Sequence, residues 1–265
     1  MALSRWRVIR DGAHDGFTQM AVDEAMLELA RESQAVWLRL YRFHPPALSL
    51  GRAQPLAGIY LPGLREIGAD LVRRPSGGQA VLHDDELTYA LAAPLTVIGG
   101  SVTESYRQIA EALRLALAKL GVKAELSTGQ PLARPDRADP NCFVSPTAYE
   151  LTIGGKKAVG SAQVRRRGVL LQHGALPKTL DFERWSACFA PPGAERLGWQ
   201  TAMEARAVGL FSHLPEERRP SDQDLEDALV AGLAEHFKVE FAAAELPAAT
   251  SRLAEAMRDG AGPIR

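Results

Sequence analysis

The 265-residue sequence has little cysteine, little net charge and no long apolar run. Its two cysteines, Cys142 and Cys188, are too few for a disulfide framework or a zinc cage. A formal net charge of -1 gives no general attraction to nucleic acid or to acidic membranes. No stretch approaches the roughly 18 apolar residues of a membrane span, and the N-terminus has no apolar run of signal-peptide length. We therefore expect a cytoplasmic protein that binds neither nucleic acid nor membrane and whose function lies in a local site.

Helix and strand patterns alternate along a chain that is long enough to bury a sizeable core. Apolar spacing predicts helices over residues 18–32, 61–69, 103–121, 221–238 and 248–259. Apolar or alternating runs predict strands over residues 5–12, 35–43, 47–50, 70–74, 80–83, 87–95, 123–127 and 169–176. Thr18 is a candidate N-cap for the first helix. Because alanine, glutamate and leucine become frequent after Trp199, we expect a main domain of residues 1–200 and a helical appendage of residues 201–265.

A Gly-Gly pair at residues 154–155 separates strand-like runs at 149–153 and 157–165, which predicts a β-hairpin. A loop rich in proline, glycine and aspartate precedes Cys142, and Lys157 begins the second strand of the hairpin. If the hairpin folds back over the end of this loop, thiol and amine come close together. The cation would then raise the thiolate fraction of Cys142. On spacing alone, a packed apolar side chain is the simpler interpretation of Cys142.

Two other features have simple structural interpretations. Cys188 falls at helical spacing with Phe182 and Trp185, so packing in the core explains it better than nucleophilic chemistry. Three consecutive arginines at residues 165–167 lie in a predicted strand, where the first and third share one face and the second opposes them. This placement favours a charged strand edge, on which an acidic protein could dock, over a nucleic-acid stripe.

The stretch LVRRPSGGQAVLHDDELTYAL, residues 71–91, concentrates charge and glycine between two apolar runs. Gly77 and Gly78 allow a tight turn or a close backbone approach to a ligand, and Arg73 and Arg74 could neutralise a phosphate or a carboxylate. A surface turn with solvated arginines explains the composition equally well. The stretch is not a phosphate-binding loop, because it lacks the Gly-Lys-Ser/Thr ending and does not open a helix.

His83 is followed by three carboxylates, Asp84, Asp85 and Glu86, which raises the question of a metal site. Neighbouring strand residues point to opposite faces, and the sequence has no second cluster with ligand spacing. We therefore expect no metal site here. A hydrogen-bonded His83 that helps to shape a pocket is the preferred interpretation.

Four stretches resemble, in order, motifs of the lipoate-protein ligase and octanoyltransferase superfamily, the biotin/lipoate A/B protein ligase family. They are MAVDEAML, LRLYRFHPPALSLGRAQ, RRPSGGQAVLHDDELTYAL and KKAVGSAQVRRRGVLLQHGAL. The likeness runs from about residue 5 to residue 190. ATP-using ligases of this superfamily usually carry a third glycine where this chain has Gln79 after Gly77 and Gly78. The resemblance is therefore closest to octanoyltransferases of the LipM type.

The resemblance implies an α+β fold of the class II tRNA synthetase and biotin synthetase kind, with a mixed, largely antiparallel sheet packed with helices. It also implies that Cys142, in NCFVSPTAYEL, is the acyl-carrying nucleophile and that Lys157 is its catalytic partner. The remaining residues that it assigns to substrate binding are Arg73, Arg74, Gly77, Gly78, Gln79, His83, Gly160, Ser161 and Ala162.

The implied reaction moves an octanoyl group from an acyl carrier protein to a lysine of a lipoyl domain, such as the glycine-cleavage H protein. It passes through a Cys142 thioester and needs no cofactor. One alternative is an ATP-dependent lipoate or octanoate ligase that forms an acyl-adenylate with Lys157. A second is a non-catalytic protein that binds lipoyl domains or acyl carriers. A biotin ligase fits less well, because its glycine-rich pattern does not stand at residues 73–79.

Overall fold

The computed structural model describes residues 4–127 and 149–260 of the chain. Its main feature is a six-stranded mixed sheet with the strand order β10-β11-β6-β2-β1-β12. The strands are β1 (Ser4–His14), β2 (Trp37–Phe43), β6 (Glu86–Pro94), β10 (Gly160–Arg166), β11 (Val169–Pro177) and β12 (Val239–Ala243). Three neighbouring pairs are antiparallel, and β1 runs parallel to both β2 and β12. This architecture confirms the predicted α+β class.

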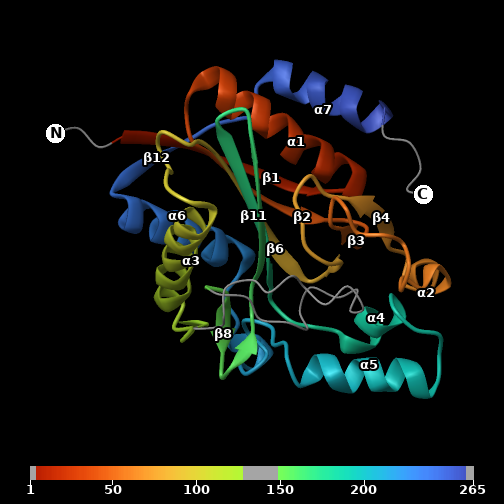
Figure 1. The fold of residues 1–265 in the computed structure, drawn as a ribbon. Coiled ribbons are helices and arrows are strands. Elements are labelled where there is room, and N and C mark those ends of the chain that lie inside the picture. Colours follow the sequence, from red (N-terminus) through yellow and green to blue (C-terminus); the bar gives the residue numbers. More distant parts are fainter. Residues whose placement is uncertain (1–3, 128–148, 261–265) are drawn as a thin grey trace.

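Helices cover both faces of this sheet (Figure 1). They are α1 (Gly16–Ser33) and α7 (Ala248–Gly260) on one face, and α3 (Val102–Lys119) and α6 (Asp222–Phe237) on the other. In β6, Leu87, Tyr89 and Leu91 pack towards α3 and α6, whereas Ala90 and Ala92 pack towards α1. Because strand side chains alternate between faces, the continuous apolar run of β6 is buried on both sides.

Two three-stranded sheets flank the main one. The first has the order β4-β3-β5, with β3 (Ala47–Leu50), β4 (Asp70–Arg73) and β5 (Val81–His83). It shares a hydrophobic cluster with α2 (Leu61–Glu66), α4 (Phe182–Ala187) and α5 (Ala194–Glu204). The second has the order β7-β8-β9, with β7 (Glu125–Leu126), β8 (Leu151–Ile153) and β9 (Lys156–Lys157). The short helix η1 (Glu216–Arg218) precedes α6.

The predicted Gly-Gly hairpin is present between β8 and β9, but the strand expected over residues 157–165 is divided. Gly154 and Gly155 both adopt positive φ angles, as a tight turn between antiparallel strands requires. The strand pairing with β8 ends at Lys157, although the N–H groups of Ala158 and Val159 still donate to Leu151 of β8, and β10 begins at Gly160 in the main sheet. The main chain of Lys157 bonds instead to Arg206 and Val208, whose distance in sequence hid the break.

Two smaller expectations are wrong. The N-cap of α1 is Asp15 and not Thr18, because Asp15 accepts hydrogen bonds from the backbone N–H and the hydroxyl of Thr18. Arg167 does not share a strand face with Arg165, because it lies in the turn after β10 with a φ of 48°. Arg166 forms an ion pair with Glu24 of α1, with 2.6 Å between Nη1 and Oε1.

The segment after residue 200 packs into the same layers as the rest of the chain. Strand β12 pairs with β1, and α6 lies along α3. Glu226 of α6 accepts ion pairs from Arg10 of β1 and Arg42 of β2, at 2.7 and 2.8 Å. The division between residues 200 and 201 stays a prediction about domain organisation.

Candidate functional site

A small cavity, partly open to solvent, lies where the main sheet meets the small sheet of β3, β4 and β5. Five of the residues expected at the site line it: Arg74, His83, Gly160, Ser161 and Ala162. Met20 of α1 and Val81 of β5 contribute apolar walls. The mainly apolar lining suits a hydrophobic ligand group. As bounded by the described residues, the cavity is not lined by Gly77, Gly78, Gln79, Arg73 or Lys157.

Arg73 and Arg74 hold backbone carbonyl groups of neighbouring loops. Arg73 Nη1 donates to the carbonyl oxygens of Gly51 and Gln54, at 2.8 and 2.7 Å. Arg74 Nη2 donates to the carbonyl oxygens of Gly77 and Gln79, at 2.8 and 2.7 Å. Of the interpretations open to these arginines, the described contacts support loop anchoring over solvated surface side chains.

The loop between β4 and β5, residues 74–80, approaches a second loop closely at the glycine pair. Gly78 has a φ of 93°, a conformation that L side chains rarely adopt. A Cβ atom on Gly51 would lie 1.9 Å from the carbonyl oxygen of Gly78. Gly51 must therefore be glycine because of this close backbone approach, and Gly78 is favoured as glycine by its positive φ. Gly77 has open space around it. Gln79 is half-buried and contributes its carbonyl group to Arg74.

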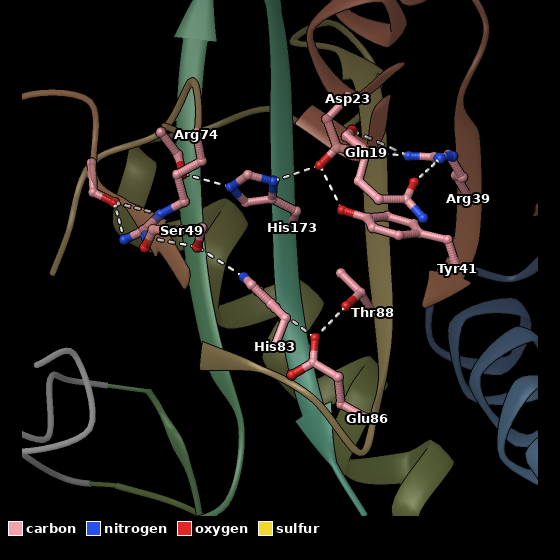
Figure 2. Close-up of polar contacts among 12 residues, drawn as sticks. Gln19, Asp23, Arg39, Tyr41, Ser49, Arg74, His83, Glu86, Thr88 and His173 are labelled. Atoms are coloured by element: carbon pink, nitrogen blue, oxygen red, sulfur yellow. Dashed lines mark hydrogen bonds and ion pairs between the residues drawn. The ribbon is translucent and has the colours of Figure 1, made fainter. Parts of the chain in front are cut away.

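His83 is hydrogen-bonded on both ring nitrogens and lines the cavity, as expected. Its Nε2 lies 2.8 Å from Ser49 Oγ, and its Nδ1 lies 2.6 Å from Glu86 Oε1 (Figure 2). Arg74 Nη1 donates to Ser49 Oγ at 3.2 Å, and Thr88 Oγ1 donates to the same Glu86 oxygen at 2.6 Å. Ser49, His83 and Glu86 form what we term the His83 relay.

A second relay was not foreseen from the sequence. His173 of β11 also lines the cavity, with Nε2 2.5 Å from Ser76 Oγ and Nδ1 2.7 Å from Asp23 Oδ2. Asp23 is fully buried on α1 and also accepts hydrogen bonds from Tyr41 and Arg39 (Figure 2). Ser76, His173 and Asp23 form what we term the His173 relay. A buried histidine next to Gln172 in the mainly apolar strand VLLQHGALP is the local signal that could have pointed to it.

Lys157 is buried, and its Nζ lies 2.6 Å from Glu150 Oε1. The side chains of Lys157 and Glu150 are only 2% and 3% exposed, so this ammonium group is held away from bulk water. Cys142, its expected partner, lies outside the described residues. The proximity of the two groups therefore stays a prediction.

Cys188 behaves as the packed core residue that its spacing indicates. It is fully buried at the end of α4, and its Sγ contacts the carbonyl oxygen of Arg184 at 3.5 Å. Burial raises the pKa of the Cys188 thiol to about 12. The thiolate, which is the nucleophilic form, is therefore scarce at neutral pH.

Within residues 4–127 and 149–260, no three or more histidine, cysteine, aspartate or glutamate side chains are grouped as a metal site requires. Among the helices of those ranges, none has both the length and the apolar character needed to cross a membrane.

Comparison with known proteins places this chain in a family. The chain is 40% identical to octanoyltransferase LipM of Moorella thermoacetica, over 80% of this chain and 77% of that protein. It is 39% identical to octanoyltransferase LipM of Kyrpidia tusciae, over 96% of this chain and 94% of that protein. A bipartite lipoate protein ligase from Thermoplasma acidophilum shares the fold, with a TM-score of 0.79 at 22% identity. The superposition covers 97% of this chain and 93% of that chain. Residues 15–234 match the lipoyl protein ligase A/B catalytic domain, and the chain belongs to that family.

Proposed function

We propose that this chain, an octanoyltransferase by its family and its relatives, takes octanoyl groups from an acyl carrier protein. The acceptor is the ε-amine of a lysine on a lipoyl domain, and the glycine-cleavage H protein is the domain that we expect. The observation that carries the proposal is the identity of 40% and 39% to two octanoyltransferases over 80% and 96% of this chain. We place the reaction in the cytoplasm.

The reaction has two steps with Cys142 as the nucleophile. The Cys142 thiolate attacks the carbonyl carbon of the donor thioester, the C–S bond to the carrier breaks, and the carrier sulfur leaves as a thiolate that takes a proton from solvent. The neutral acceptor amine then attacks the Cys142 thioester and an amide forms. The C–S bond breaks, Cys142 leaves as a thiolate, and the proton lost by the nitrogen passes to solvent. The first step exchanges one thioester for another at nearly equal energy, and the second is downhill. The transfer therefore needs neither ATP nor a cofactor.

Lys157 would donate a hydrogen bond to the acyl carbonyl oxygen as negative charge grows on it. Its burial and its ion pair with Glu150 support this role, because an ammonium group shielded from water interacts more strongly with a developing oxyanion. Removal of one such donor typically lowers the rate on the order of a hundredfold.

The cavity beside His83 and Ser161 would hold the eight-carbon chain. At roughly 0.8 kcal/mol for each buried methylene, six methylenes contribute up to about 5 kcal/mol. The measured affinity will be smaller, because binding also orders the chain and the protein. The apolar walls at Met20 and Val81 support this use of the cavity.

Intact-mass spectrometry after incubation with octanoyl carrier protein tests the proposal. We expect one added octanoyl group that hydroxylamine removes, and we expect its loss in Cys142→Ala. Cys188→Ala is the matched control and should keep the adduct, because its buried thiol is protonated at neutral pH. An adduct that persists in Cys142→Ala would contradict the assignment of the nucleophile.

An ATP-dependent ligase is the rival that shares this fold. Lipoate-protein ligase A bound with ATP superposes with a TM-score of 0.79, but an identity of 22% shows the fold alone. The two activities separate in a Cys142→Ser variant supplied with octanoate, ATP and a lipoyl domain. Full ligation by that variant would establish the ligase, whereas our proposal expects none.

A further inference from the structure

The His173 relay connects the loop of residues 74–80 to the centre of the main sheet. Ser76 is fully buried, although the two glycines that follow it are exposed. Its hydroxyl lies 2.5 Å from His173 Nε2, and its carbonyl oxygen accepts the backbone N–H of Arg52 at 2.8 Å. The hydroxyl and the carbonyl group of Ser76 are therefore both held by residues distant from it in sequence.

Asp23 sets the orientation of the His173 ring. Its Oδ2 is 2.7 Å from His173 Nδ1 and 2.8 Å from the hydroxyl of Tyr41, and its Oδ1 is 3.1 Å from Arg39 Nη1. A carboxylate only accepts hydrogen bonds, so Nδ1 carries the proton that points to Asp23. In the neutral ring Nε2 is then an acceptor, and the hydroxyl of Ser76 donates to it.

The same ring also forms part of the cavity wall, next to Gly174 and Ala175 of β11. A shift of His173 would therefore move the cavity wall and release Ser76 at the same time. Ser76 does not itself line the cavity as bounded by the described residues, and its buried hydroxyl faces the ring. Despite its serine–histidine–aspartate geometry, the relay thus positions the site and is not a second nucleophile.

We propose that His173, oriented by Asp23, is a positioning residue for octanoyl transfer. Through Ser76 it holds the backbone at Gly77 and Gly78, and its ring sets the shape of the acyl cavity. The inference rests on the proposed function, because it assigns the cavity to the acyl chain. We therefore expect that loss of the His173 relay changes the selectivity for acyl-chain length as well as the rate of acyl transfer.

The test measures the rate of acyl-enzyme formation with hexanoyl, octanoyl and decanoyl carrier proteins. Misplacement by about 1 Å can lower a rate on the order of a hundredfold, and we expect His173→Ala to lose about that much with the octanoyl donor. We also expect a several-fold fall in its preference for octanoyl over decanoyl. His173→Gln, which keeps an acceptor and a donor, should recover part of both.

Ser76→Ala and Ser76→Thr form a second, milder pair that avoids a large change in the core. We expect Ser76→Ala to lose selectivity and Ser76→Thr, which retains the hydroxyl, to keep more of it. His213→Gln, at an exposed histidine, is the matched control and should match the wild type. Thermal unfolding of each variant separates a loss of stability from a change in selectivity.

Three outcomes would overturn the inference in different ways. If the wild type forms the thioester but folded Ser76→Ala and His173→Ala keep its selectivity and rate, the positioning role is wrong and the transferase stands. If the wild type forms no hydroxylamine-labile adduct, the proposed function fails and this inference fails with it. An octanoyl ester mapped to Ser76 would also contradict the positioning role.

Discussion

The two histidine relays have the same chemical order but differ in how completely the carboxylate is paired. Asp23 uses both oxygens, with Arg39 on Oδ1 and Tyr41 and His173 on Oδ2. Glu86 uses only Oε1, and its buried Oε2 has no hydrogen-bond partner within the part of the chain that the structure describes. A fully paired buried carboxylate fixes its neighbours, whereas a half-paired one leaves an acceptor to be satisfied. The His173 relay is therefore the more rigid of the two.

The largest effect should come from Asp23→Asn, which replaces one of two accepting oxygens with an NH2 group. That NH2 group then faces another donor, and buried Arg39 loses one charged partner while it keeps its ion pair with Asp11. We therefore expect a loss of about 2–4 kcal/mol in the free energy of unfolding, below the full cost of a buried charge left alone. Urea unfolding of Asp23→Asn measures this loss. A loss under about 1 kcal/mol would show that Asp23 does not hold its hydrogen-bond partners rigidly.

Arg74→Lys should have the second largest effect, through the His83 relay. Arg74 donates to Ser49 of that relay and to the carbonyl oxygens of Gly77 and Gln79. A lysine cannot reproduce this planar fork, so we expect a loss of about 1.5–3 kcal/mol in unfolding free energy. Arg52→Lys is the matched control, because the side chain of Arg52 is exposed. Equal stability of the two variants would argue that the hydrogen bonds of Arg74 do not stabilise the loop of residues 74–80.

Glu86→Gln should have a smaller effect than Asp23→Asn and thereby tests the comparison directly. Glutamine can keep Oε1 as the acceptor for His83 and Thr88, and it places its NH2 group where Oε2 now lacks a partner. We expect a change of about 1 kcal/mol or less in the free energy of unfolding. If urea unfolding shows losses as large as those of Asp23→Asn, the two carboxylates are equally constrained.

The smallest effect concerns pH and Asp85, two residues after His83. Burial raises the pKa of the Asp85 carboxyl, but hydrogen bonds from Lys178 and Thr179 outweigh it, so the folded pKa lies below 3.8. The contribution of Asp85 to the free energy of unfolding is therefore present above its unfolded pKa and is lost as pH falls through its folded pKa. Burial lowers the pKa of Lys178, but its carboxylate partners Asp85 and Asp222 outweigh burial, so the folded pKa of Lys178 lies above 10.5. The contribution of Lys178 to stability is therefore lost only as pH rises above 10.5.

We expect Asp85→Asn to reduce stability by about 0–1 kcal/mol between these limits, because both groups are partly exposed. The difference from the wild type should disappear below the folded pKa of Asp85. Urea unfolding at a series of pH values measures it. A difference that grows as the solution is acidified would reverse the sign that we derive.

Much of the fold was predictable from local patterns. The helices at residues 18–32 and 103–121 and the strands β1, β2, β6 and β11 of the main sheet appear where apolar spacing placed them. Helix α5 and strand β12 were missed, because α5 buries only Met203 and β12 is a short strand whose partner β1 lies at the other end of the chain.

The sequence by itself determined the order of the motifs, and with it the family, the loop glycines and the core packing of Cys188. These depend on residue type and on neighbours within a few positions. Only the tertiary structure decided that His173 meets Asp23, 150 residues away, and that Ser76 meets His173 at a distance of 97 residues. Such pairs depend on the register of β11 against β6 and on the packing of α1 over the sheet, which no local pattern contains.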